Sequence, residues 1–247
     1  MRSFSTISLF ALLTTSLANP VERAAKPQVI NNCSKQGTVA LTFDDGPYNF
    51  EKAVAKNLNG GKGTFFLNGN NFVCIYDRAD QIKELYNAGH TIASHTWSHP
   101  DLTTLNEAQI NTELKKVEDA MIKILGVKPK YFRPPYGNLN DLALKVLGQR
   151  GYTKVFLWSD DTEDANGAPA SKGKQVLDGI AKDYPKPHLV LSHSTHGETA
   201  NEVLPHSVPI LKKAGYKLVT AGQCVGTDES PYIKVGQPGT KDASWKC

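Results

Sequence analysis

The sequence predicts an α/β fold in which helices cover parallel strands, and a barrel is favoured over an open sheet. Short apolar runs alternate with longer amphipathic segments, which is the pattern of repeated strand–helix units. These units recur about seven times, a number closer to a barrel than to a small open sheet. The 247 residues are 40% hydrophobic and 21% charged, which is enough apolar chain for one sizeable core.

Each element is predicted from residue type and period. Short apolar runs predict strands at 39–43, 64–67, 91–93, 155–158, 189–191 and 216–220. A further strand is predicted to end at Arg133. Amphipathic patterns predict helices at 79–88, 104–125, 139–149, 174–183 and 200–214. Parallel α/β folds place their chemistry at the carboxyl ends of strands, so polar residues that follow these runs are the candidates for a site.

The longest predicted helix spans residues 104–125. Thr104 and Glu107 match a capping box, in which the two side chains satisfy each other's backbone N–H groups. Apolar residues then recur every three or four positions and predict one buried face, formed by Ile110, Leu114, Val117, Met121 and Leu125.

The first residues of the chain are typical of an export signal. Arg2 precedes a short apolar run, and small residues at Ser16 and Ala18 suit a signal peptidase. A buried N-terminal helix is the alternative interpretation. We expect a protein secreted to the extracellular space or the cell wall. The expected organisation is a signal peptide at 1–18, a leader at 19–36, a central domain at 37–225 and a C-terminal extension at 226–247.

Charge and hydropathy exclude two classes of partner. The formal net charge of +4 is scattered and forms no basic stripe with interleaved aromatic residues, so nucleic acid is not expected. After the first twenty residues or so, no apolar segment is long enough to span a bilayer, so a membrane is not expected either. We expect a monomer.

Four cysteines in an exported chain favour two disulfides. None lies in a CxxC pair, which disfavours a structural zinc site. Three pairings are open; Cys33 precedes the first predicted core strand and Cys224 follows the last, so we favour Cys33–Cys224 with Cys74–Cys247. Asn32 begins a glycosylation sequon, although a disulfide at the next residue would restrict access to it.

Two adjacent acids close the first predicted core strand. Asp44 and Asp45 follow an apolar run and precede Gly46 and Pro47. A solvated turn is the alternative, because Asp-Gly is common turn chemistry. Adjacent strand residues point to opposite faces, so both carboxylates can reach one site only if the chain leaves strand geometry here.

Two histidines follow the third predicted strand. His95 and His99 are four residues apart, so on a helical turn they would lie on one face and could chelate one metal ion. Two ordinary polar histidines are the alternative. Together with a carboxylate from another strand end they form a His2Asp set with an open position, the stoichiometry of a catalytic zinc site.

Three more strand ends carry polar residues. Arg133 precedes two prolines and Tyr136, so its guanidinium could orient a carboxylate through a bidentate pair, with a stiff surface loop as the alternative. Four acids fall within residues 160–164, after Trp158, a pattern that more often marks a solvated loop. His193 directly follows an apolar strand, which places its ring at the same rim.

Five motifs in this order resemble those of the NodB-type polysaccharide deacetylases, carbohydrate esterase family 4. They are TFDDGP at 42–47, HTWSHP at 95–100, RPPYG at 133–137, DTED at 161–164 and LVLSHS at 189–194. The match covers roughly residues 37–225, and the tail from Pro231 is similar to the ends of secreted fungal chitin deacetylases. The resemblance implies a distorted (β/α) barrel of about seven parallel strands.

The resemblance also implies an activity and a metal centre. The expected reaction is metal-dependent hydrolysis of the N-acetyl group of N-acetylglucosamine units in chitin or chitooligosaccharides, giving chitosan and acetate. Asp45, His95 and His99 would hold zinc, with cobalt or another divalent metal as the alternative. Asp44 would be the general base.

The remaining roles follow from the same resemblance. Arg133 would orient Asp44, and the backbone N–H of Tyr136 would help to hold the oxyanion. His193 would be the general acid, and Asp161 would lie behind it and keep it charged. A carboxylate beside a histidine favours the imidazolium, which is the form that donates a proton.

The resemblance also implies substrate contacts, and it leaves rival functions open. Leu191 fits the apolar contact for the acetyl methyl, whereas Ala165 stands where the family often has a bulky aromatic residue, which leaves that wall to Trp158. An esterase for acetylxylan or peptidoglycan shares the motifs. A non-catalytic secreted chitin-binding protein is the second alternative. Phosphoryl chemistry ranks last, because no glycine-rich phosphate cradle is present.

Overall fold

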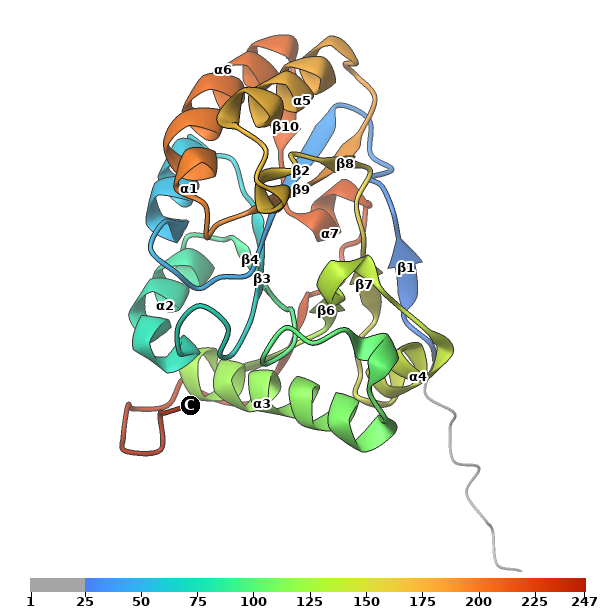
Figure 1. Cartoon of the computed structure of the whole chain (residues 1–247), viewed down its shortest axis with the longest axis vertical. Coiled ribbons are helices and arrows are strands. Elements are labelled where there is room, and N and C mark those ends of the chain that lie inside the picture. Colours follow the sequence, from blue (N-terminus) through green and yellow to red (C-terminus); the bar gives the residue numbers. More distant parts are fainter. Residues whose placement is uncertain (1–24) are drawn as a thin grey trace, which may run out of the picture.

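The fold is a parallel α/β barrel that is open on one side (Figure 1). A computed structural model describes residues 25–247, and the predicted signal peptide at 1–18 lies outside the described residues. Nine strands form one sheet with parallel pairing throughout, in the order β1-β7-β6-β4-β3-β2-β9-β8, with β10 beside the start of β2. The predicted barrel class is therefore confirmed.

The central strands are short and buried on both faces. Every residue of β2, β3, β4 and β9 is buried, as expected when helices cover one face and barrel side chains fill the other. The strands of the sheet are β1 Gln28–Ile30, β2 Thr38–Asp44, β3 Thr64–Leu67, β4 Thr91–Ser94, β6 Tyr131–Phe132, β7 Lys154–Phe156, β8 Asp160–Asp161, β9 His188–His193 and β10 Lys217–Leu218. The sequence did not predict β1 and β8, which form the two ends of the sheet order.

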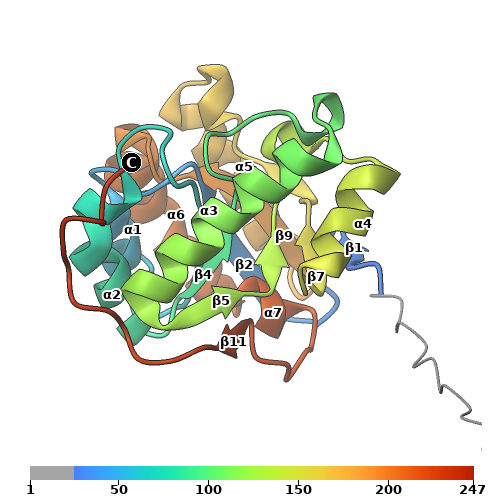
Figure 2. The same cartoon turned by 90° about the horizontal axis from the view of Figure 1, so that it is seen from below.

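Helices pack around the outside of the sheet (Figures 1 and 2). They are α1 Glu51–Asn57, α2 Ala79–Asn87, α3 Glu107–Leu125, α4 Asp141–Gln149, α5 Ala170–Lys182, α6 Leu204–Ala214 and α7 Ala221–Cys224. A π-helical turn at Thr199–Val203 precedes α6, within the segment predicted as one helix at 200–214. Neither α1 nor α7 was predicted.

The start of α3 corrects the predicted cap. Asn106 rather than Thr104 is the N-cap, and it exchanges hydrogen bonds with Gln109 in a capping box two residues further along the chain. Thr104 instead ends a short 3₁₀ turn at Leu102–Thr104. The helix ends at Gly126, whose φ of 73° is the left-handed conformation that glycine adopts without steric cost.

Strand β7 passes to β8 without a helix between them. In this link the backbone N–H of Leu157 donates to the carbonyl oxygen of Ile30, and that of Ser159 donates to the carbonyl oxygen of Leu189. The link therefore bonds to β1, at one end of the sheet order, and to β9, next to the strand at the other end. The predicted strand at 155–158 ends early, at Phe156, for this reason.

The last residues close over the base and flank of the barrel. Strand β11 (Tyr232–Lys234) pairs antiparallel with β5 (Val127–Pro129), and from there the chain runs past α2 to the C-terminus (Figure 2). Trp245 is buried and its ring lies 5.6 Å from that of Tyr76. The tail is thus packed against the barrel.

The structure confirms the favoured disulfide pairing. Cys33 is bonded to Cys224 at the end of α7, and Cys74 is bonded to Cys247. Asn32 is exposed and stays a candidate for glycosylation. Between residues 25 and 247, no helix has both the length and the apolar character needed to cross a membrane.

Candidate active site

Parallel strands bring the polar residues that follow them to one rim of the barrel. Asp44 at the end of β2 is level with His193 at the end of β9, and β4 and β6 deliver His95 and Arg133 to the same edge. A cavity of about 410 Å³ lies at this rim. Nine of the site residues predicted from the sequence line it, namely Asp44, Asp45, His95, His99, Tyr136, Trp158, Asp161, Leu191 and His193.

The two adjacent acids reach the same cavity because the chain leaves strand geometry at Asp45. Its φ of 70° turns the backbone immediately after Asp44, the last residue of β2. An added Cβ on Gly46 would lie 2.5 Å from a carboxylate oxygen of Glu51, so any larger residue at this position would have to displace the Glu51 side chain. This departure from the strand is what the sequence required for two neighbouring side chains to share a site.

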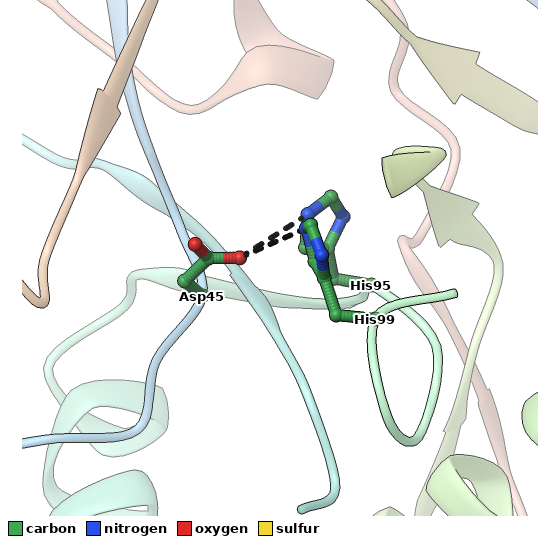
Figure 3. Close-up of side chains that lie close together, drawn as sticks. All are labelled: Asp45, His95 and His99. Atoms are coloured by element: carbon green, nitrogen blue, oxygen red, sulfur yellow. Dashed lines mark ion pairs between the residues drawn. The ribbon is translucent and has the colours of Figure 1, made fainter. Parts of the chain in front are cut away.

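Asp45, His95 and His99 form a cluster whose ligand atoms lie within 4.8 Å of one another. Oδ1 of Asp45 is 3.5 Å from Nε2 of His95 and 3.2 Å from Nε2 of His99 (Figure 3). This oxygen is buried and has no hydrogen-bond partner among the described residues. A buried carboxylate oxygen that faces two imidazole nitrogens fits a divalent metal with one aspartate and two histidine ligands.

The histidine loop differs from the predicted helical turn. Residues 95–100 form a loop in which Thr96 and His99 have φ values of 72° and 60°. The two imidazoles still converge, with ring centroids 4.9 Å apart. The prediction of convergence holds, but the helical turn offered as its cause was wrong.

The tautomer of His95 suits a metal ligand. Its Nδ1 lies 2.7 Å from the carbonyl oxygen of Arg133, so Nδ1 carries the proton that donates to this oxygen and Nε2 faces Asp45 with a free lone pair. Burial lowers the pKa of His95 to about 3, although the charge of Asp45 opposes the change. The ring is therefore neutral, as metal binding requires.

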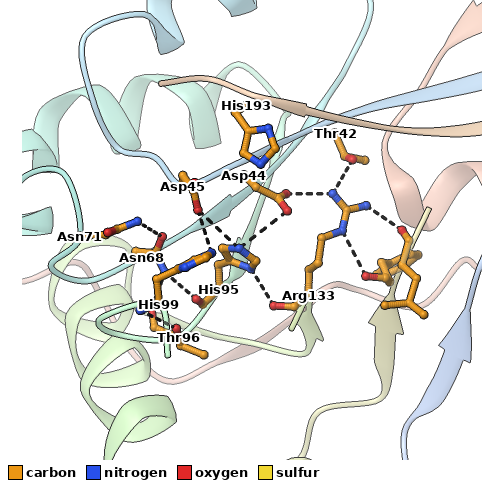
Figure 4. Close-up of polar contacts among 12 residues, drawn as sticks. Thr42, Asp44, Asp45, Asn68, Asn71, His95, Thr96, His99, Arg133 and His193 are labelled. Carbon is orange, nitrogen blue, oxygen red and sulfur yellow. Dashed lines mark hydrogen bonds and ion pairs between the residues drawn. The ribbon is translucent and has the colours of Figure 1, made fainter. Parts of the chain in front are cut away.

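Two residues that the sequence did not single out, Asn68 and Glu113, hold the ligand loops, and Figure 4 shows the contacts of Asn68. Buried Asn68 donates through Nδ2 to the carbonyl oxygens of His95 at 2.5 Å and Thr96 at 3.2 Å, and its backbone N–H donates to Gly46 at 2.7 Å. Glu113 on α3 accepts hydrogen bonds from the backbone N–H groups of Trp97 and Ser98 at 2.9 and 2.8 Å. No local sequence signal marks either residue, because both act through contacts distant in the chain.

Arg133 is fully buried and holds Asp44, but through a single hydrogen bond. Nη1 donates to Oδ1 of Asp44 at 2.8 Å and to Oγ1 of Thr42 at 2.7 Å. The remaining donors bind the carbonyl oxygens of Phe156 and Leu157, so the predicted bidentate pair is wrong. Burial raises the pKa of Asp44, and the positive charges of Arg133 and His193 oppose that rise.

The carboxylate behind His193 is Asp164, which corrects the prediction of Asp161. Oδ1 of Asp164 lies 2.7 Å from Nδ1 of His193, and Oδ2 accepts the backbone N–H of His193 at 2.8 Å. Asp161 pairs in the sheet with Leu191, two residues before His193, and its carboxylate accepts the backbone N–H of Glu163. Asp161 thus stabilises the turn at Glu163, which places Asp164 beside His193.

Asp164 keeps the imidazole of His193 charged. Burial alone lowers the pKa of His193, but the hydrogen bond and charge of Asp164 outweigh it and, with Asp44 and Asp45, raise the pKa to about 9. The hydroxyl of Thr199 donates to Oδ2 of Asp164 at 2.6 Å and holds the carboxylate in place. His193 is therefore the group of this cavity that can donate a proton at neutral pH.

The remaining wall of the cavity is partly aromatic. Trp158 packs against Gly137, where an added Cβ would lie 2.8 Å from its ring, and Leu191 is buried at the floor. Tyr136 is 65% exposed and its ring meets that of His99 edge to face at 4.7 Å. Ala165 lines the cavity at the position where the sequence lacks a bulky aromatic residue.

The fold and the site together define a class. An open parallel barrel carries a buried carboxylate and a charged histidine at neighbouring strand ends in one rim cavity, beside a candidate metal centre. This arrangement is that of a hydrolase with paired acid and base groups.

The family model described as polysaccharide deacetylase matches residues 31–155, and the chain belongs to this family. A chitin deacetylase from Pestalotiopsis is 35% identical over 238 residues, covering 92% of this chain and 79% of the relative. The structure of the chitin deacetylase from Colletotrichum lindemuthianum superimposes with a TM-score of 0.77 at 33% identity, covering 84% of this chain and 96% of that one. A peptidoglycan-N-acetylglucosamine deacetylase from Bacillus cereus is 33% identical and spans 74% of this chain and 66% of its own length.

Proposed function

We propose that this protein is a secreted chitin deacetylase, which hydrolyses the N-acetyl group of N-acetylglucosamine units to give chitosan and acetate. The observation that carries the proposal is the placement of Asp44 and His193, at the paired ends of β2 and β9, in one cavity that also contains Asp45, His95 and His99. The similarity to two fungal chitin deacetylases supports chitin as the polymer. Two disulfides are consistent with an oxidising, extracellular location.

The proposed metal ligands are Asp45, His95 and His99, and zinc is the proposed ion, with cobalt or another divalent metal as the alternative. A metal bound there would polarise the acetamide carbonyl and lower the pKa of water to about 7. Neutral His95 and the unpartnered Oδ1 of Asp45 support this assignment.

The chain's own residues divide the proton transfers. Asp44 takes the proton of the attacking water, with Arg133 fixing the orientation of its carboxylate. His193 gives its proton to the departing amine nitrogen, and Asp164 stabilises the imidazolium before that transfer. A positioned base and a positioned acid each contribute about a hundred- to ten-thousand-fold in rate. The backbone N–H of Tyr136 is proposed to donate to the oxyanion.

The cavity walls suit an acetylated sugar. Buried Leu191 is the proposed contact for the acetyl methyl group, and Trp158 offers an aromatic face to the sugar ring. A methyl-sized apolar contact is worth about 1–3 kcal/mol, so longer acyl groups are rejected mainly by steric clash.

Acetate release from defined chitin oligomers tests the proposal. The wild-type protein loaded with zinc should release acetate, a chelator should stop the reaction reversibly, and mass spectrometry should show the loss of acetyl groups. Acetylxylan and peptidoglycan serve as competing substrates, because a peptidoglycan deacetylase is among the similar proteins. Faster release of acetate from either polymer than from chitin would identify that polymer as the substrate. Binding of chitin oligomers without any release of acetate would indicate a non-catalytic chitin-binding protein.

A further inference from the structure

Glu51 is a buried carboxylate to which the proposed mechanism assigns no role. It is the first residue of α1, its side chain is fully buried, and burial raises its pKa. The partners that the structure gives it are neutral donors. A buried carboxylate whose described partners are all neutral is costly to desolvate, so the hydrogen bonds of Glu51 must offset that cost.

The hydrogen bonds of Glu51 contact both the segment that follows Asp45 and the segment that follows His193. Oε1 accepts the backbone N–H of Tyr48 at 2.7 Å and the hydroxyl of Ser194 at 3.0 Å. Tyr48 lies three residues after Asp45, and Ser194 is the residue after His193. One oxygen atom therefore joins the turn that carries the two acids to the end of the strand that carries the proposed proton donor.

This link begins where the sheet stops. The ladder between β2 and β9 ends at the pair Asp44–His193. Beyond this pair, no strand pairing among the described residues holds the segment after β2 against the segment after β9. Glu51 lies directly beneath the turn, since an added Cβ on Gly46 would be 2.5 Å from its Oε1 and 3.0 Å from the hydroxyl oxygen of Ser194. The second oxygen, Oε2, accepts from Gln81 on α2 at 2.6 Å, away from the cavity.

We propose that Glu51 is a positioning residue, which sets the spacing between Asp45 and His193 by bonding Tyr48 and Ser194 through one carboxylate oxygen. The inference rests on the proposed function, because that function makes this spacing the distance between a metal ligand and the general acid. Shifts of about 1 Å in such a distance can cost a hundredfold in rate.

The three partners of Glu51 allow matched variants. Ser194→Ala removes only the link to β9, and we expect kcat for acetate release from chitin oligomers to fall about tenfold with KM and zinc affinity unchanged. Glu51→Met removes all the links and should lower both kcat, by about a hundredfold, and the affinity for zinc. Glu51→Gln should recover most of that loss, because its amide oxygen still accepts from Tyr48 and Ser194.

Gln81→Met is the control. It removes an equally short hydrogen bond to Glu51 that leads to neither side of the cavity, so Tm should fall while kcat stays within about twofold. The inference is overturned if Ser194→Ala keeps wild-type kcat, or if Gln81→Met loses as much kcat as Ser194→Ala. If the wild type releases no acetate, the proposed function fails. The role of Glu51 can then still be tested by comparing the zinc affinities of Glu51→Met and Gln81→Met, and equal affinities would overturn the inference.

Discussion

The two sides of the cavity are built in different ways. On the metal side, Asp45, His95 and His99 come within a few residues of the ends of β2 and β4. Asn68 binds the histidine loop through its side chain and the turn at Gly46 through its backbone N–H. On the other side, His193 ends β9, but its partner Asp164 comes from a short 3₁₀ turn beyond β8. The first arrangement depends on the sheet, and the second depends on a loop.

This difference explains where prediction from the sequence succeeded. Residues next to strand ends are placed by the ladder, so their convergence follows once the strands are recognised as parallel. A loop carboxylate is placed by the path of the loop. Asp161 and Asp164 are both aspartates and lie three residues apart, so the sequence does not distinguish them. The turn at Glu163, with a φ of 59°, decides which of them contacts His193.

The largest expected effect falls on the metal side. His99→Ala removes one of three proposed ligands, and we expect loss of bound zinc and a drop in kcat/KM of about ten-thousand-fold or more. Metal analysis of the purified variant together with acetate release measures both. A variant that keeps stoichiometric zinc and full activity would remove His99 from the metal centre.

The next largest effect separates the two adjacent acids. Asp44→Asn should lower kcat by about a thousandfold and leave the zinc content near that of the wild type. Asp44 is hydrogen-bonded to Arg133 and lies 3.7 Å from Nε2 of His95 alone, whereas Asp45 faces both imidazoles at 3.5 and 3.2 Å. Metal analysis and single-turnover kinetics test this. Loss of zinc in Asp44→Asn would show that the roles of the two acids are reversed.

On the loop side, Asp164→Asn should lower kcat by about a hundredfold, and Asp161→Asn should lower it by less than tenfold. Asp164 raises the pKa of His193, so its loss should also move the alkaline limb of the kcat profile to lower pH. Acetate release measured from pH 6 to pH 10 distinguishes the two variants. The larger shift in Asp161→Asn would restore the original assignment from the sequence.

A smaller effect is expected where a neighbouring helix supports the histidine loop. Glu113→Ala removes the acceptor of the Trp97 and Ser98 backbone N–H groups, and we expect zinc affinity to fall about tenfold. Lys115→Ala is the matched control, because its partner Asp119 is on the same helix and both side chains are largely exposed. Competition with a chelator of known affinity measures the change, and equal affinities in the two variants would contradict the role.

The smallest effect concerns stability in the metal-free protein. The pKa of His193 is raised to about 9 from an unfolded value of about 6.5, so its protonated form stabilises the fold. This contribution is fully present below about pH 6.5 and is lost as the pH rises through about 9. Asp164→Asn should flatten the decline in unfolding free energy over this interval, as denaturant titrations at several pH values would show. An unchanged slope would mean that the pair is not formed.

By itself the sequence predicted parallel strands, with a barrel favoured over an open sheet, and the convergence of Asp44, Asp45, His95, His99, Arg133 and His193 at one rim. It left three disulfide pairings open, and the structure shows the favoured one, Cys33–Cys224 with Cys74–Cys247. Apolar runs define strands, and parallel strands all end at one rim, so a residue's distance from its strand end is enough to place it. Only the tertiary structure decided that Asp164 partners His193, that Arg133 bonds Asp44 once, and that Asn68, Glu113 and Glu51 support the loops. These contacts join segments far apart in the chain or depend on positive φ angles in turns. Neither feature produces a periodic pattern in the sequence from which it could be predicted.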